Sequence, residues 1–137
     1  MLLRPGQLTL DELQAIHGGL QPLMMDPAAL PGIRASAAVV QAAAAGDAPV
    51  YGVNTGFGKL ASTRIAREDL ATLQLKLLRS HAVGVGEPMT ERVVRLILIL
   101  KATSLARGFS GVREEVVDAL INLHNAGVVP VIPCQGS

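Results

Sequence analysis

The sequence predicts an all-α domain, and two observations lead to that prediction. Five segments carry apolar residues at helical spacing, and capping residues or glycines bound most of them. Of the 137 residues, 50% are apolar but only 2% are aromatic. The core must therefore be built from Ala, Leu, Val and Ile, which suit close contact between helices. At this length we expect a single domain over residues 1–137.

The boundaries of the five predicted helices come from start and stop signals, and the helices cover about residues 10–17, 31–45, 68–84, 91–108 and 111–127. Thr9 and Glu12 form a capping-box pattern before the first helix. Thr90 and Ser110 are candidate caps for the fourth and fifth helices. The third helix carries leucines at helical spacing, namely Leu70, Leu73, Leu77 and Leu78.

The segments between these helices are predicted to be extended or loop-like. Residues 48–53, "APVYGV", read as a brief extended piece, and residues 82–88, "AVGVGEP", as a loop that can move. The segment "RGFSGV", residues 107–112, reads as a tight helix–helix turn, and capping explains its residues as well as a recognition role would. Residues 128–137 are extended, apolar and without a charged tail, so we expect the natural domain to continue beyond them.

Bulk properties argue against several classes of protein. The net charge is +1 and no basic stripe stands out, which argues against nucleic-acid binding. The most apolar stretch, residues 93–100, is shorter than the ~20 residues of a membrane helix and contains Arg95, so we interpret it as a central buried helix. The N-terminus lacks a signal-peptide pattern. Cys134 is alone, which fits a reducing compartment, and we expect a cytoplasmic protein.

The mean hydropathy of +0.41 is high for a chain of this kind. Part of the surface is therefore expected to be covered by another chain or by a further segment of the same protein.

The glycine-rich stretch "YGVNTGFGKLAST", residues 51–63, is predicted to be a loop with a functional role. It contains the only tyrosine of the chain, and its other notable members are Gly52, Asn54, Thr55, Gly56, Phe57 and Gly58. Glycines cannot supply a packed face, and Asn and Thr favour turns. Tyr51 is therefore either a half-buried tyrosine with a satisfied hydroxyl or a general acid or base on a loop that closes over a substrate.

Two phosphate-binding motifs can be compared with this loop, and both fit poorly. Residues 56–61 match G-x-G-x-x-G/A, but that motif needs a strand before it and a helix after it in a βαβ unit. The P-loop pattern fails because Lys59 is followed by Leu60 and position 53 is not glycine.

The three histidines receive different interpretations. His17 and His124 are assigned surface or capping roles. His81 follows Ser80 at the end of the third predicted helix, so it is either a substrate contact or an ordinary helix terminus. No spacing of His, Cys, Asp or Glu matches a metal site, and no metal is expected.

Several motifs acting together resemble those of a known family. "YGVNTGFGKLASTRI", "LLRSHAVGVGEP" and "LARGFSGVREEVVDALINLHNAGVVPVIPCQGS" occur in this order. They resemble the N-terminal part of the aromatic amino-acid ammonia-lyases, and within that family the histidine-specific members. The resemblance covers essentially the whole chain, and "YG-x-NTGFG" is its most specific part.

The resemblance implies a helical N-terminal domain and a function in histidine degradation. These enzymes remove ammonia from an amino acid by elimination, and for L-histidine the product is urocanate. Tyr51 matches the family's acid/base tyrosine on its active-site loop. His81 matches the position that histidine holds in histidine-specific members, whereas relatives specific for phenylalanine or tyrosine replace Ser80-His81 by Phe-Leu or His-Leu. The alternatives are a phenylalanine or tyrosine ammonia-lyase, an aminomutase, or a non-catalytic helical interaction module.

The resemblance also implies features that this chain lacks. The family's electrophile is 4-methylidene-imidazol-5-one, which forms by cyclisation of an internal Ala-Ser-Gly, and residues 1–137 do not contain that tripeptide. Family members are homotetramers in which the loop tyrosine serves a neighbouring subunit's electrophile. We therefore expect the chain alone to be inactive and its Tyr51 loop to be mobile.

Overall fold

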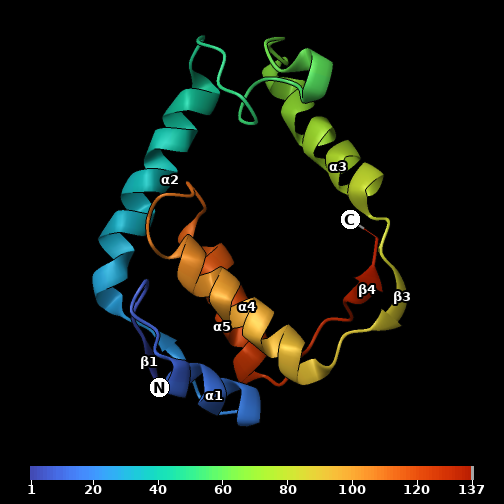
Figure 1. Ribbon diagram of the computed structural model, residues 1–137. Helices are drawn as coiled ribbons and strands as arrows, with labels where there is room; N and C mark the ends of the chain where they lie inside the picture. Colours follow the sequence, from blue (N-terminus) through green and yellow to red (C-terminus); the bar gives the residue numbers. More distant parts are fainter. Residues whose placement is uncertain (137) are drawn as a thin grey trace.

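The computed structural model describes residues 1–136, and within them it has five α-helices, which confirms the all-α prediction. These are α1 (Leu10–Gly18), α2 (Leu30–Ala45), α3 (Leu70–His81), α4 (Glu91–Leu105) and α5 (Glu114–Asn125) (Figure 1). Short 3₁₀ turns are η1 (Pro27–Ala29), η2 (Gly58–Leu60) and η3 (Arg67–Asp69). Ser137 lies outside the described residues.

Within residues 1–136 there are two small two-stranded sheets, which the sequence patterns did not predict, and each joins one end of the described chain to another segment of it. Strand β1 (Leu2–Leu3) pairs in parallel with β2 (Met24–Met25). Strand β3 (Val85–Pro88) pairs antiparallel with β4 (Pro133–Gln135).

Helix α4 is the centre of the core, as its apolar pattern predicted. It packs mainly against α5 and α1. The core cluster joins α4 and α5 to the N-terminal strands and helices through Leu3, Ile16, Leu23, Met25, Ile33, Ile99, Ala102, Ala106, Val117 and Ile121. Arg95 is buried in α4, where its guanidinium Nη2 lies 3.4 Å from the carbonyl oxygen of His17 at the end of α1. A cation at that position suits the negative end of the α1 dipole.

Helix boundaries confirm some predicted caps and correct others. The capping box is present, because the Glu12 amide donates to Thr9 Oγ1 (3.2 Å) and the Thr9 amide donates to Glu12 Oε2 (2.8 Å). Thr90 occupies the N-cap of α4 but makes no side-chain capping bond. The predicted start of the fifth helix after Ser110 is wrong, since α5 begins at Glu114.

The late start of α5 has a physical cause. Gly108 and Gly111 both adopt positive φ and hold the segment between α4 and α5 in a turn that lies close against α2. The chain cannot enter a right-handed helix until it has left these two positions.

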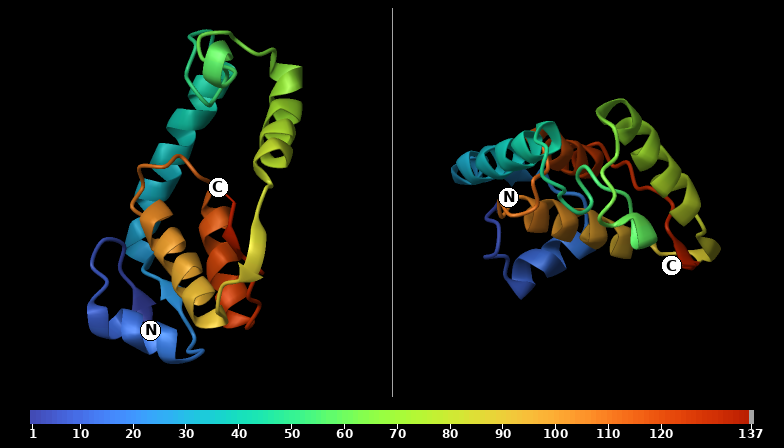
Figure 2. Two further views of the ribbon diagram at one scale, coloured as in Figure 1. Left: turned by 45° about the vertical axis from the view of Figure 1, so that its right-hand side comes forward. Right: turned by 90° about the horizontal axis from the view of Figure 1, so that it is seen from above.

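Helices α2 and α3 extend away from the core, and the glycine-rich loop bridges their far ends (Figures 1 and 2). Helix α2 buries only Ile33 and Ala37, and α3 buries none of its residues. The predicted leucine face of α3 therefore does not enter the core, and Leu78 is 69% exposed.

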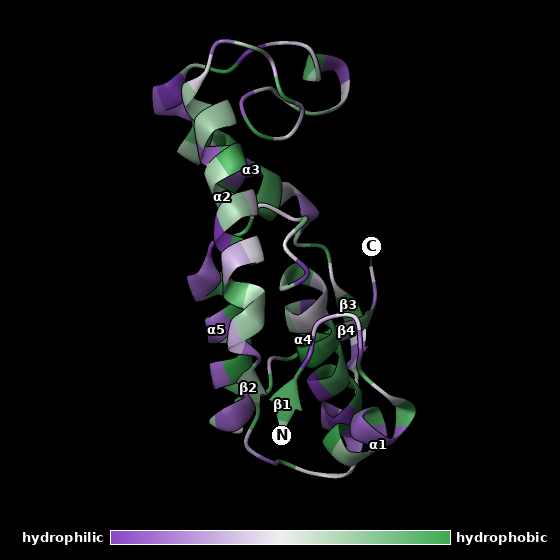
Figure 3. Ribbon diagram, turned by 90° about the vertical axis from the view of Figure 1, so that its left-hand side faces the viewer, coloured by the Kyte–Doolittle hydropathy of each residue, from purple (hydrophilic) through white to green (hydrophobic). Residues whose placement is uncertain are grey.

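Apolar colouring also continues along α2 past the core (Figure 3). The helical stretch Pro27–Ala45 is the one part of residues 1–136 that meets a length-and-hydropathy test for a membrane span. Helices of proteins outside membranes pass the same test, so it is a weak indicator.

His124 is fully buried, which corrects its assignment to the surface or to a cap. Its Nε2 lies 3.1 Å from the carbonyl oxygen of Gln21, and because a carbonyl only accepts, Nε2 carries the proton. The ring is buried because Val117, Ile121 and His124 share the inward face of α5 at helical spacing. Neighbouring Asn125 pairs through its side chain with both main-chain groups of Leu23, each at 2.8 Å.

Residues 82–88 were predicted to be a loop, and this is wrong for residues 85–88, which form strand β3. Pairing is possible because two glycines let the partner strand approach closely. A Cβ atom on Gly84 would lie 2.9 Å from Pro133 Cγ, and one on Gly86 would lie 3.3 Å from Gln135 Cγ. Residues 133–136 are thereby held beside the segment that follows His81 directly.

Candidate functional site

The glycine-rich loop starts with a closed turn rather than the extended piece predicted for residues 48–53. The carbonyl oxygen of Val50 accepts from the amides of Val53 (3.0 Å) and Asn54 (3.2 Å), and the Val50 amide donates to Asn54 Oδ1 (2.7 Å). These bonds curl the chain, so a strand cannot form. Tyr51 lies inside this turn.

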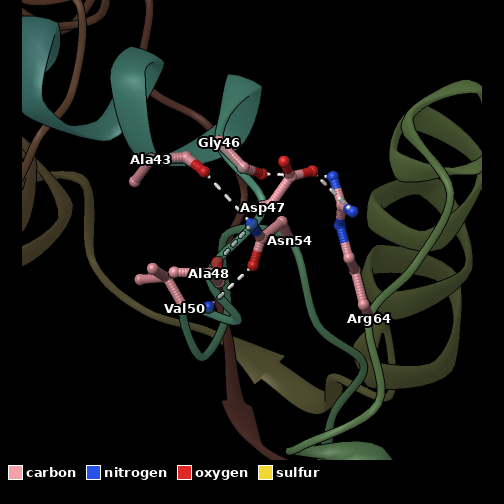
Figure 4. Close-up of polar contacts among 7 residues, drawn as sticks. All are labelled: Ala43, Gly46, Asp47, Ala48, Val50, Asn54 and Arg64. Carbon is pink, nitrogen blue, oxygen red and sulfur yellow. Dashed lines mark hydrogen bonds and ion pairs between the residues drawn. The ribbon is translucent and has the colours of Figure 1, made fainter.

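Asn54 and Thr55 are interior residues of the loop, each only 1% exposed. Thr55 forms an isolated antiparallel bridge with Arg64, and the Ile65 amide donates to the Asn54 carbonyl (2.9 Å). Arg64 in turn contacts Asp47 Oδ1 (2.9 Å) and the Gly46 carbonyl (3.2 Å) (Figure 4). The two ends of the loop are thus joined at a common base.

The glycines of the loop serve backbone geometry. Gly52 and Gly58 have φ values of +74° and +58°, a region that L side chains rarely adopt. Gly56 is buried, and a Cβ atom on it would lie 2.4 Å from the Cβ of Leu60 in η2. The sequence Gly-x-Gly at 56–58 therefore starts a short 3₁₀ turn rather than a phosphate-binding helix.

Tyr51 is directed outward from this base. The residue is 64% exposed, so its side chain is not half-buried. No group within residues 1–136 forms a hydrogen bond with its hydroxyl. Its ring meets Phe57 edge-on, with ring centroids 5.9 Å apart and an interplanar angle of 73°. Such aromatic pairs favour one orientation of the phenol. The phenol is therefore available to a group approaching from outside this chain.

Ser80 and His81 form a small polar unit at the end of α3. Nδ1 of His81 lies 2.9 Å from the Leu77 carbonyl oxygen and 3.0 Å from Ser80 Oγ, which itself donates to the same carbonyl (2.9 Å). Because that carbonyl can only accept, Nδ1 of the neutral ring must carry the proton. Nε2 is then left as a hydrogen-bond acceptor on an exposed side chain.

The structure does not bring Tyr51 and His81 together within this chain. The Tyr51 loop precedes the first residue of α3 and His81 is its last (Figure 1). A helix of 12 residues is about 18 Å long. The Tyr51 loop and His81 therefore lie toward opposite ends of α3. The mobility of the loop stays a prediction.

No group of three or more His, Cys, Asp or Glu residues within residues 1–136 is arranged to hold a metal ion. The two Ala-Ser pairs are also unsuited to forming the family's electrophile. Ala35-Ser36 lies inside α2, with Ser36 Oγ bonded to the Ile33 carbonyl (3.0 Å), and Ala61-Ser62 is followed by threonine instead of glycine. The residues present do not fit that group.

Together these features define a helical domain that presents a loop phenol and, elsewhere, an imidazole acceptor at a helix end. The model of the family described as aromatic amino acid lyase matches residues 8–137, and the chain belongs to that family. It is 56% identical over all 137 residues to the histidine ammonia-lyase of Paracidovorax citrulli, covering 27% of that protein.

Solved structures give the same fold. The crystal structure of histidine ammonia-lyase from Trypanosoma cruzi matches with a TM-score of 0.88 and 39% identity, over 99% of this chain and 26% of that one. Ergothionase from Treponema denticola matches with a TM-score of 0.92 and 26% identity, over 100% and 28%. The chain thus spans about a quarter of the length of the proteins it matches.

The sequence interpretation did not foresee the buried role of Asn54 or the clamp between Arg64 and Asp47. An Asn among glycines indicates a turn, and no local pattern shows that its side chain is interior. The buried position of His124, in contrast, had a signal, since it continues the helical spacing of Val117 and Ile121.

Proposed function

We propose that this chain is the N-terminal domain of a histidine ammonia-lyase, which removes ammonia from L-histidine without oxidation and yields urocanate. The observation that carries the proposal is the Ser80-His81 unit, which presents an imidazole acceptor at the end of α3. The 56% identity to a histidine ammonia-lyase over the whole chain supports it.

His81 is proposed to select the substrate. Its free Nε2 would accept a hydrogen bond from the imidazole N–H of histidine. Phenylalanine has no such donor, so its binding would leave Nε2 without a partner in a closed site. A site built to bond a substrate N–H rejects analogues that lack it, because the unpaired group costs free energy.

Tyr51 is proposed as the acid or base. In the elimination, a base takes the β-proton of histidine while the amine leaves. A phenol on a loop can perform this proton transfer once substrate is bound and water is displaced. The exposed hydroxyl of Tyr51, free of partners within residues 1–136, supports this role.

The electrophile is proposed to come from outside these residues. The resemblance to the family implies an Ala-Ser-Gly segment shortly after position 137. Strand β4 holds residues 133–136 beside the segment that follows His81, so the Ala-Ser-Gly segment would emerge close to His81, the proposed substrate selector. For the same reason, residues 1–137 alone are expected to have no lyase activity.

The protein is proposed to act as a cytoplasmic homotetramer, with residues 1–137 as one structural unit. Helix α3 buries none of its residues, and apolar side chains such as Leu75 and Leu78 are exposed on it. Apolar surface of this kind is normally covered in an assembly. The position of the Tyr51 loop before α3 and of His81 at its end also suits a site shared between subunits.

The test is to assay the full-length enzyme that contains residues 1–137 with histidine, phenylalanine and tyrosine, following the conjugated product by ultraviolet absorbance. Histidine should be the preferred substrate. Tyr51→Phe should lower kcat by about 10²- to 10⁴-fold, the usual contribution of acid–base catalysis. His81→Leu should lower kcat/KM for histidine by about 10- to 100-fold, the loss expected for one hydrogen bond in a closed site.

Preferred turnover of phenylalanine or tyrosine would replace the proposal with the corresponding lyase or aminomutase. No turnover of any of the three by a folded full-length protein would point to a non-catalytic interaction module.

A further inference from the structure

Asn54 is the most densely hydrogen-bonded side chain of the glycine-rich loop (Figure 4). Its Nδ2 donates to the carbonyl oxygens of Ala43 (3.1 Å) and Ala48 (2.9 Å), and its Oδ1 accepts from the Val50 amide (2.7 Å). Both amide hydrogens and the side-chain oxygen are therefore in use. Since the residue is only 1% exposed, water does not compete for these bonds.

These bonds connect three parts of the chain. Ala43 lies in the last turn of α2, Ala48 in the segment that leaves the helix, and Val50 at the start of the turn that contains Tyr51. Asn54 ends that turn. The orientation of the Tyr51 turn relative to α2 is thus set by one buried side chain.

The other contact at the base of the loop, an ion pair, is much more exposed than Asn54. Asp47, which pairs with Arg64 at 2.9 Å, has a side chain that is 96% exposed, and that of Arg64 is 50% exposed. An ion pair as accessible as this contributes little, because solvent screens it and the long Arg64 side chain must be ordered. The buried amide, and not the surface pair, is the stronger constraint on the loop.

We propose that Asn54 is a positioning residue, which holds Tyr51 in the direction needed for proton transfer. The proposal rests on the catalytic role proposed for Tyr51. Asn54 touches no substrate, so its effect is expected on the chemical step and not on histidine recognition at His81. A misplacement of about 1 Å can cost on the order of 10²-fold in rate.

The decisive substitution is Asn54→Asp. It keeps the size of the side chain and the acceptor for the Val50 amide, but it sets a carboxylate oxygen against the two carbonyl oxygens of Ala43 and Ala48. In the full-length enzyme we expect kcat to fall by about 10- to 100-fold while KM for histidine changes by less than about 2-fold. The matched control is Asp47→Asn, which removes the exposed ion pair and should change kcat by less than about 2-fold.

A double-mutant cycle with Tyr51→Phe separates this inference from the proposed function. In the Tyr51→Phe background, Asn54→Asp should cause no further fall in kcat, because there is no phenol left to position. If Tyr51→Phe alone leaves kcat unchanged, the catalytic role proposed for Tyr51 fails and the inference about Asn54 fails with it. If Tyr51→Phe lowers kcat but Asn54→Asp has no effect, or an equal effect in both backgrounds, only the role of Asn54 is overturned.

Amide hydrogen exchange gives a second readout that does not depend on activity. Exchange over residues 50–54 should be faster in Asn54→Asp than in the wild type and unchanged in Asp47→Asn. If Asn54→Asp does not fold, Asn54→Ala replaces it in both experiments, since it removes the bonds without adding charge. A folded Asn54→Ala enzyme with full kcat and unchanged exchange would overturn the inference.

Discussion

Two backbones lie in close contact where the turn after α4 meets α2, and Gly108→Ala tests that contact. Gly108 has a φ of +78°, and a Cβ atom added there would lie 2.8 Å from the carbonyl carbon and 2.9 Å from the carbonyl oxygen of Gly32. Real Cβ atoms do not approach backbone this closely. Because the obstacle is main chain, no change of rotamer can relieve it.

Gly127→Ala is the matched control for this substitution. Gly127 follows α5 as Gly108 follows α4, and its φ is +67°, but a Cβ atom there would meet only the end of the Leu20 side chain at 3.4 Å. The left-handed conformation costs alanine about 1–2 kcal/mol. Alanine also lowers the conformational entropy of the unfolded chain relative to glycine, which offsets about 0.4–1 kcal/mol of this cost in both variants.

The free energy of unfolding should therefore fall by at most about 1.6 kcal/mol for Gly127→Ala. Overlap with packed neighbours adds about 1–3 kcal/mol for Gly108→Ala. When each substitution is made in the same polypeptide and urea unfolding is followed by the circular dichroism of the helices, the unfolding midpoints of the two variants should differ by about 1 M. Equal destabilisation of the two variants, within about 0.5 kcal/mol, would show that the backbone contact is not tight and refute the reasoning.

Two further predictions concern the core and the link between α2 and α5. Ile99→Ala should lower the free energy of unfolding by about 2–5 kcal/mol because Ile99 is 0% exposed. Ile97 lies on the same helix but is 38% exposed, so Ile97→Ala should cost less than about 1 kcal/mol. Equal values for the two variants in urea titrations would contradict the assignment of the core. The hydrogen bond from Arg34 Nε to Glu114 Oε2 (2.6 Å), helped by the charge of Arg34, holds the pKa of Glu114 below its ordinary value of 4.5. A carboxylate whose pKa is lowered in the folded state stabilises the folded protein above pH 4.5, and this contribution is lost as the pH falls through the pKa of the folded state. The Glu114→Gln variant should therefore be less stable than wild type at neutral pH, and the difference in stability should shrink in acid. A stability difference that stays constant from neutral pH into acid would show that the pair does not act through charge.

Local residue patterns were sufficient for the class of fold and for the identity of the candidate residues. The capping box of Thr9 and Glu12 was predictable because all its bonds lie within one helical turn. Tyr51 and the Ser80-His81 pair were found from their motifs, and the family model then matched the chain. Their roles remain proposals.

Contacts between distant segments settled the features that local patterns could not. Strands β3 and β4 pair residues about 50 positions apart, and His124 bonds to Gln21 across more than 100 positions. Asn54 looked like an ordinary turn residue, yet its amide is buried against α2, because the turn folds back on the end of that helix. Capping depends on neighbours within a turn of chain, whereas burial and strand pairing depend on which segments meet in space. The helices of this protein could therefore be read from its residues, and the anchoring of its tyrosine loop could not.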